Sequence, residues 1–213
     1  MTTGVLGLVV VLAIILFSMV LHELSHGAVA YLLGDTTAKD SDRLTLNPLK
    51  HLDPFMSVLL PVLLYIGGGP IFGGAKPVPI NTQNLKFREW GFALVALAGP
   101  MTNFLLALIG FLVGYWTGWL VRADFIGYVA QYFVMINLGF AVFNMLPIPP
   151  LDGSRILYAI SPDGVRRILN SIESFGIWLV LILVAVFGAF FSSIMGGAMD
   201  GILRFFYFIV GAA

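Results

Sequence analysis

The sequence predicts an all-α protein that crosses a membrane several times, and two observations carry this prediction. Hydrophobic residues make up 59% of the 213-residue chain and charged residues only 10%, which excludes an ordinary soluble domain. Apolar runs long enough to span a bilayer recur, and no polar stretch between them could fold as a separate soluble unit. We therefore expect one membrane-embedded domain over residues 1–213. The formal net charge of zero gives no sign of nucleic-acid binding.

The first half of the chain contains one long apolar run and one short one. The long run covers residues 5–33 and ends at a Gly-Asp pair, a typical helix stop. The short run, 55–66, falls below the roughly 20 residues that a spanning helix needs, so we expect it to be re-entrant. Beyond it, prolines alternate with apolar residues, and this pattern predicts a short β-like hairpin near residues 71–81.

The second half contains three further long apolar runs. They cover residues 90–121, 125–146 and 175–194, and a cluster of prolines ends the middle one. The tail from residue 201 is apolar but short, so it could span, lie at the interface or form a half-helix. In total the sequence predicts five or six membrane segments, including the re-entrant one.

The first apolar run contains the pattern His-Glu-x-x-His. Residues i and i+4 share one face of a helix, so His22 and His26 can bind one zinc ion through their imidazoles. Glu23 lies beside them, where its carboxylate can accept a proton from a water at the metal. The seventeen residues before this cluster carry no charge. Since ionisable groups inside a membrane are costly, we interpret the cluster as functional rather than accidental.

A catalytic zinc site needs a third protein ligand, and spacing alone does not identify it. The candidates are His51, Asp35, Asp53 and Asp152. Asp152 follows a proline-rich break, and irregular backbone at membrane depth is tolerated where it lines a cavity. Equally, Asp152 could cap a helix over residues 153–160. His51 could instead be a hydrogen-bonding loop residue or a gating group.

Two asparagines interrupt the later apolar runs. In the simplest interpretation Asn103 and Asn144 each form a hydrogen bond between helices, which is worth roughly 0.6–2 kcal/mol. Asn144 has an alternative catalytic interpretation, because its amide could donate to the oxyanion of a tetrahedral intermediate. We expect Asn103 to be structural.

The distribution of basic residues predicts the topology. Lys and Arg number three in 35–54, three in 70–89 and three in 151–173, against Arg122 alone in the connection between the second and third long runs. If residues 55–66 dip into the membrane and return, all three polar loops lie on the same side. The positive-inside rule then places these loops in the cytoplasm and the zinc nearer the cytoplasmic side of a plasma membrane.

Three motifs together resemble the site-2 protease family of intramembrane zinc proteases. They are His-Glu-x-x-His at 22–26, Ala-Gly-Pro with a nearby Asn at 98–103, and Asn-x-x-Pro followed by Leu-Asp-Gly at 144–153. The stretches 43–54 and 74–79 are similar to the compact prokaryotic branch of the family. The resemblance implies that the Asp of Leu-Asp-Gly, Asp152, is the third zinc ligand and that three spans form the core. No PDZ or CBS domain is recognisable, so regulation by such modules is absent or supplied by a membrane partner.

These observations predict an intramembrane metalloprotease with one zinc ion per chain. His22, His26 and Asp152 are its expected ligands, and Glu23 and Asn144 its expected catalytic groups. The expected substrate is the transmembrane segment of a single-span membrane protein, which must unwind locally to expose its carbonyls. Two alternatives are a silent metal-binding scaffold and a metal or ion transporter. A transporter would need polar residues along several spans, and the runs at 90–121 and 175–194 have almost none.

Overall fold

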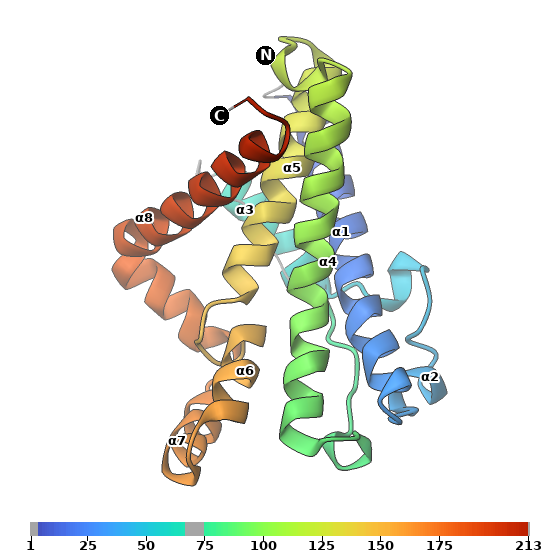
Figure 1. The fold of residues 1–213 in the computed structure, drawn as a ribbon, viewed down its shortest axis with the longest axis vertical. Coiled ribbons are helices and arrows are strands. Elements are labelled where there is room, and N and C mark those ends of the chain that lie inside the picture. Colours follow the sequence, from blue (N-terminus) through green and yellow to red (C-terminus); the bar gives the residue numbers. More distant parts are fainter. Residues whose placement is uncertain (1–3, 67–74, 213) are drawn as a thin grey trace.

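The computed structural model of the chain describes residues 4–66 and 75–212, and the regular structure of these residues is entirely helical. Four helices in this part are long and apolar enough to cross a membrane (Figure 1): α1 (Val5–Leu32), α4 (Arg88–Trp116), α5 (Phe125–Asn144) and α8 (Ile177–Ile209). The shorter elements are α2 (Thr37–Asp40), η1 (Pro48–Lys50), η2 (Pro54–Leu59), α3 (Leu60–Ile66), η3 (Thr82–Asn84), η4 (Trp119–Val121), α6 (Asp152–Ile160) and α7 (Asp163–Glu173). The all-α membrane fold class is confirmed.

Helices α1, α4 and α5 pack together and form the core of the molecule (Figure 1). Ile15 of α1 packs with Phe140 of α5 in one buried cluster. Phe111 of α4, Leu138 of α5 and Phe206 of α8 meet in another. Because lipid tails are as apolar as these side chains, close packing rather than exclusion of water stabilises such contacts.

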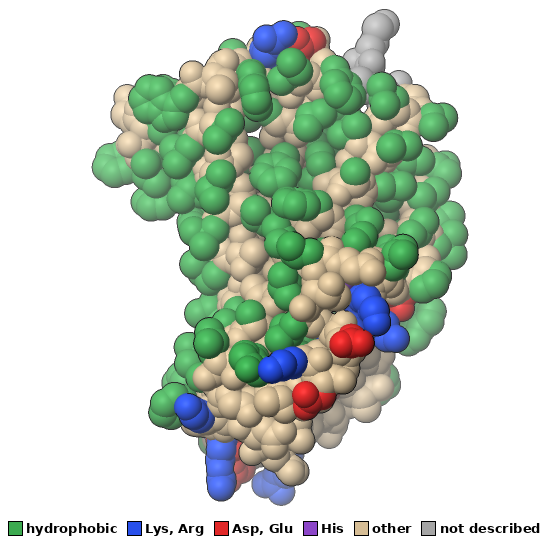
Figure 2. Space-filling model, turned by 90° about the vertical axis from the view of Figure 1, so that its right-hand side faces the viewer, with side chains coloured by type: hydrophobic (Ala, Val, Ile, Leu, Met, Phe, Trp, Pro, Cys, Tyr) green, Lys and Arg blue, Asp and Glu red, His purple; other side chains and the backbone are tan. Residues whose placement is uncertain are grey.

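The polar elements gather at one end of the molecule. Helices α2, α6, α7 and the start of α4 lie at the lower end in Figure 1, and the α4–α5 connection lies at the upper end. Figure 2 shows basic and acidic side chains near the lower end, an apolar belt above them, and a basic and an acidic side chain at the top. At the upper end Arg122 forms an ion pair with Asp124. The described elements α2, α6 and α7 and the start of α4 therefore lie at the same end of the apolar belt.

The short apolar run is helical but is described only in part. Elements η2 and α3 cover residues 54–66, and residues 67–74 lie outside the described part of the chain. The backbone N–H of Lys76 donates to the carbonyl oxygen of His51 at 2.9 Å. The chain therefore returns by residue 76 to the neighbourhood of residue 51.

Residues 75–81 form no strand, so the predicted β-like hairpin near 71–81 is wrong for the part that the structure describes. The remaining part, 71–74, lies outside the described residues. Proline nitrogens carry no hydrogen, and the neighbouring amide of Val78 donates to the carboxylate of Glu23 at 2.8 Å. The amides of this segment therefore bond to other parts of the protein instead of forming a strand ladder.

The last membrane segment also differs from the prediction. Instead of a run at 175–194 followed by a separate tail, one helix α8 continues to Ile209, with non-helical dihedral angles at Phe187 (φ −113°, ψ 26°). Glycines near residue 200 do not end it, because a break in lipid would leave backbone groups without hydrogen-bond partners. The helix bends at Phe187, and its second half returns to the core (Figure 1).

Candidate metal centre

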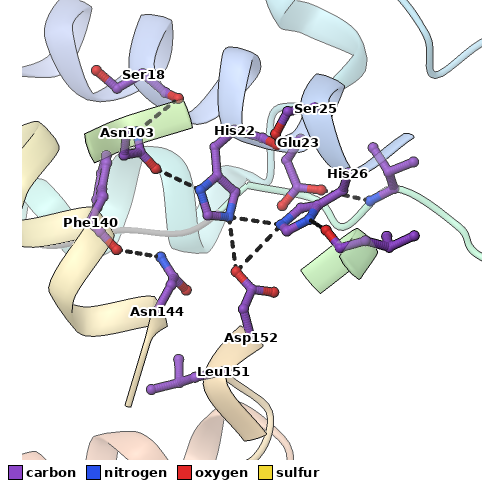
Figure 3. Close-up of polar contacts among 12 residues, drawn as sticks. Ser18, His22, Glu23, Ser25, His26, Asn103, Phe140, Asn144, Leu151 and Asp152 are labelled. Carbon is purple, nitrogen blue, oxygen red and sulfur yellow. Dashed lines mark hydrogen bonds and ion pairs between the residues drawn. The ribbon is translucent and has the colours of Figure 1, made fainter. Parts of the chain in front are cut away.

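Two buried histidines lie one turn apart on α1, as their spacing predicts. The Nε2 atoms of His22 and His26 are 3.0 Å apart. Asp152, the first residue of α6, places its Oδ2 atom 3.2 Å from Nε2 of His22 and 3.4 Å from Nε2 of His26 (Figure 3). We call these three residues the candidate metal centre.

The three facing atoms of the candidate metal centre have the spacing that a zinc ion requires. Metal–ligand distances of about 2.05 Å in a tetrahedral site imply ligand atoms about 3.3 Å apart. The observed separations of 3.0, 3.2 and 3.4 Å surround this value. Oδ2 of Asp152 is also buried and, within the described part of the chain, has no hydrogen-bond partner. A buried carboxylate oxygen in that state is costly unless a cation satisfies it. The residues present therefore fit zinc.

Asp152 reaches the histidines because α5 stops short. Prolines follow soon after Asn144, and the chain turns back before α6 begins. The helix-cap alternative for Asp152 is wrong, because Leu151 occupies the N-cap and Asp152 is already the first helical residue. A Cβ atom on Gly153 would lie 2.2 Å from the carbonyl oxygen of Met145, so α6 packs directly against the end of α5.

Helix α4 approaches the histidines more closely than any side chain would permit. A Cβ atom on Gly99 would lie 2.4 Å from Nε2 of His26 and 2.5 Å from Nε2 of His22. One turn earlier, the carbonyl oxygen of Val95 accepts a hydrogen bond from Nδ1 of His26 at 2.6 Å. This contact leaves Nε2 of His26 facing the candidate metal centre.

The second ring nitrogen of His22 also has a partner. Its Nδ1 lies 2.6 Å from Oδ1 of Asn103 on α4 (Figure 3). The Nδ2 amide of Asn103 donates in turn to Oδ1 of Asn137 on α5 at 3.0 Å. Both asparagines are fully buried. Partners of this kind orient histidine ligands in metal sites.

Glu23 lies beside the candidate metal centre and shares a cavity of about 630 Å³ with it. Its Oε2 atom accepts the hydrogen bond from the backbone N–H of Val78. Asn144 also lines this cavity, and its Nδ2 donates to the carbonyl oxygen of Phe140 at 3.0 Å (Figure 3). Both catalytic candidates from the sequence thus reach the same space as the metal centre.

The other candidate ligands are engaged elsewhere. His51 is buried, with Nε2 2.9 Å from the carbonyl oxygen of Thr45. Asp53 borders the cavity but caps the short helix that follows it. Asp35 lies at the end of α1, where its carboxylate accepts hydrogen bonds from Thr37, Asn81 and Asn84. Burial alone would raise the pKa of Asp35, but these hydrogen bonds outweigh it and lower the pKa.

Three features of the site were not predicted from the sequence. They are the fit of Gly99 against both histidines, the carbonyl of Val95, and the contact from Asn137 to Asn103. A Gly-Pro pair and a lone Asn inside apolar runs were available as signals for the first and third. The carbonyl of Val95 has no sequence signal, because every residue carries one.

Fold and site together define a class of protein. Two histidines and an aspartate that fit zinc lie among membrane-length helices, with a carboxylate in the same cavity. This is the arrangement of a membrane-embedded zinc peptidase.

Comparisons with known proteins agree. The model of peptidase family M50 matches residues 118–188, a stretch that includes Asp152. YwhC of Bacillus subtilis is 39% identical over 200 residues, which cover 90% of this chain and 88% of the relative. Rip2 of Mycolicibacterium smegmatis is 34% identical over 178 residues, which cover 83% and 66% respectively. Both relatives carry names that assign them as zinc metalloproteases.

The chain belongs to the site-2 protease family, peptidase family M50. It is therefore an intramembrane zinc metalloprotease, and the transporter alternative is not supported. No solved structure matches the chain significantly.

Proposed function

We propose that this metalloprotease cleaves peptide bonds in or near transmembrane segments of single-span membrane proteins, as one membrane-embedded domain over residues 1–213. His22, His26 and Asp152 hold the zinc ion, and Glu23 is the general base. The observation that carries the assignment is the convergence of three buried ligand atoms within 4.8 Å of one another, next to a carboxylate in one cavity.

The roles of the side chains follow from their positions. Bound zinc supplies a Lewis acid that polarises the scissile carbonyl and activates water at roughly neutral pH. Glu23 takes the proton of the attacking water and passes it to the leaving amine. The Val78 amide holds one oxygen of Glu23 and leaves the other for this transfer. Asn144, which has a second amide hydrogen besides the one given to Phe140, donates to the developing oxyanion.

The cavity suits an opened substrate segment better than an intact helix. A helix uses its own carbonyls in internal hydrogen bonds, so the scissile region must unwind before attack. Residues of the irregular segment 75–80 border the cavity beside Glu23. We assign them as the edge along which the unwound substrate lies, with backbone hydrogen bonds that form when it enters.

Replacement of Glu23 by Gln tests the mechanism. The base is lost while the ligands stay intact, so zinc binding should persist and cleavage should fall by roughly 10²–10⁴-fold. The measurement is bound zinc together with turnover of a single-span model substrate in reconstituted membranes. Glu89→Gln at the start of α4 is the matched control and should cleave like the wild type. Near-normal cleavage by Glu23→Gln would remove Glu23 as the base.

We further propose that residues 55–66 are re-entrant and that the polar end of the molecule faces the cytoplasm across the plasma membrane. The return of Lys76 to His51 and the shared position of the polar loops support this topology. Because the chain has no cysteine, single cysteines can be introduced at exposed positions and labelled from either side. Cysteines at Asp42, Gln83 and Asp163 should label from the cytoplasm, and one at Ala123 from outside. Labelling of Gln83 together with Ala123 would mean that the segment spans.

A further inference from the structure

Three buried polar side chains form a line across three membrane helices. His22 of α1 contacts Asn103 of α4 at 2.6 Å, and Asn103 contacts Asn137 of α5 at 3.0 Å. Neither asparagine has any exposed surface. Asn137 is not one of the three residues of the candidate metal centre, and its side chain bonds to Asn103 and to the carbonyl oxygen of Phe133, so direct ligation does not explain its burial.

Two backbone carbonyls fix which way each amide points. The Nδ2 group of Asn137 donates to the carbonyl oxygen of Phe133 at 2.9 Å, so its Oδ1 must face Asn103. The Nδ2 group of Asn103 donates to that Oδ1 and also approaches the carbonyl oxygen of Ser18 at 3.4 Å. Carbonyl oxygens only accept hydrogen bonds, so Oδ1 of Asn103 is left to face His22.

This orientation determines the proton on His22. An amide oxygen accepts but never donates, so Nδ1 of His22 must carry the hydrogen in the contact with Asn103. A neutral imidazole has one N–H, so Nε2 then presents its lone pair toward Asp152 and His26. We propose that Asn137 and Asn103 act as a relay that selects the Nδ1–H tautomer of His22 and so prepares Nε2 to bind zinc.

The arrangement with both amides turned over is unfavourable, because it places acceptors against acceptors at Asn137. If both amides turned over, Nδ2 of Asn103 would donate to Nδ1 of His22, and the proton would move to Nε2, where it blocks metal binding. Oδ1 of Asn137 would then face the carbonyl oxygen of Phe133, and Oδ1 of Asn103 would face that of Ser18. Unpaired acceptors in a buried site each cost about 1–3 kcal/mol. A backbone carbonyl of α5 thus favours one tautomer of His22 on α1.

His26 obtains the same tautomer without a relay. Its Nδ1 donates to the carbonyl oxygen of Val95, which no side-chain substitution removes. Side-chain substitutions in α4 or α5 can therefore change the tautomer of His22 but not that of His26. The His26 signal thus serves as an internal control in the same protein.

The inference rests on the proposed ligand role of His22, but its first test needs no zinc. The chain has three histidines, so ¹⁵N-histidine labelling of the full-length, zinc-free protein in nanodiscs resolves each ring. At a pH high enough for both rings to be neutral, we expect His22 and His26 of the wild type both to show the Nδ1–H tautomer. In Asn137→Leu the His22 signal should shift toward a mixture of tautomers, and that of His26 should not change.

Zinc affinity is the second readout, measured by chelator competition. Loss of an outer partner typically weakens metal binding by about 10–100-fold, so we expect that range for Asn103→Leu and a smaller, several-fold loss for Asn137→Leu. Asn103→Asp keeps an acceptor for His22 and should retain affinity within about tenfold of the wild type. Gln131→Leu removes another amide from α5, one that bonds to Leu120, and should leave zinc binding unchanged.

The outcomes distinguish the relay from the ligand role of His22. An Nε2–H tautomer at His22 in the wild type overturns the relay. So does Asn137→Leu with lower thermal stability but unchanged tautomer and zinc affinity, because Asn137 then only packs α5. If His22→Ala keeps zinc while the tautomer data hold, the ligand assignment fails and the hydrogen-bond relay stands.

Discussion

Helices α1 and α8 have almost the same hydropathy but very different surroundings. Their most apolar windows have mean hydropathies of 2.8 and 2.5, yet 44% of the α1 window is buried inside the molecule and only 6% of the α8 window. Helix α1 contributes two of the three candidate metal ligands, and α8 contributes none. Hydropathy therefore identifies which segments enter the membrane but not which of them build the site.

Polar groups and glycines mark the difference between the two regions. On α1 the rings of His22 and His26 are buried and hydrogen-bonded, and Gly99 of α4 lies against both of them. On α8 both Asp200 and Arg204 are exposed, and a Cβ atom on Gly188 would meet no described atom within 4 Å. Close approach and internal hydrogen bonds hold membrane helices together, and here they are concentrated at the site.

The strongest test of this contrast replaces one glycine in each region. Gly99→Ala puts a methyl group 2.4 Å from Nε2 of His26 and 2.5 Å from Nε2 of His22, so α4 must move away and zinc binding should be lost together with cleavage. Gly188→Ala should leave both unchanged. The measurement is the zinc content of the purified proteins. If purified Gly99→Ala protein contained a full complement of zinc, the close approach of α4 at Gly99 would not be needed for zinc binding.

A second test exchanges one carboxylate in each region. Asp152→Asn replaces an anionic ligand by a neutral amide, and zinc affinity should fall by more than about 100-fold, beyond the loss of an outer partner. Asp200→Asn should change it less than twofold. Chelator competition gives both numbers. His51→Ala should keep its zinc; if it lost zinc while Asp152→Asn retained it, the ligand set would move to the 35–54 loop.

A third test compares two phenylalanines of α8 itself. Phe206 is buried against Phe111, and Phe190 is exposed. Phe206→Ala should destabilise the protein by about 3 kcal/mol through the cavity that it leaves, and Phe190→Ala by much less. Unfolding in mixed detergent micelles measures the two free energies. Equal effects would mean that the second half of α8 does not pack on the core as described.

The smallest expected effect lies at the exposed start of α5. A hydrogen bond from Arg122, together with the amide of Gly127, lowers the pKa of Asp124 to about 2. A depressed carboxyl pKa stabilises the folded protein above the unfolded value of about 4, and this contribution is lost as pH falls through about 2. Asp124→Asn removes this contribution but keeps the helix cap, so the unfolding midpoint should fall only slightly at pH 7, since the ion pair is exposed. The difference from the wild type should vanish as pH falls through about 2. A pH series of unfolding midpoints checks this.

The sequence predicted the parts of the fold that depend on local pattern. Apolar length identified α1, α4 and α5, and the i, i+4 spacing placed His22 and His26 on one face. It failed where the partner is distant in the chain. Prolines near residue 78 suggested a hairpin, but the amide of Val78 bonds to Glu23 more than fifty residues earlier. The sequence also suggested a run at 175–194 and a separate short tail from residue 201, whereas the structure has one helix to Ile209 that bends at Phe187.

The candidate site divides in the same way. The resemblance to a family identified Asp152, which spacing alone had left open between ligand and helix cap. The structure brings Asp152 to the histidines and places Asn144 and Glu23 in one cavity. Asn103 looked merely structural because its contact with His22 and its link to Asn137 depend on how three helices pack, and no local pattern encodes that packing.

The candidate ligands come from widely separated parts of the chain, and this has a consequence for biosynthesis. His22 and His26 leave the ribosome in the first helix, whereas Asp152 follows only after α4 and α5 are complete. A growing chain therefore carries an incomplete ligand set through most of its synthesis. The candidate ligand set is therefore complete only once α6 has docked against the end of α5.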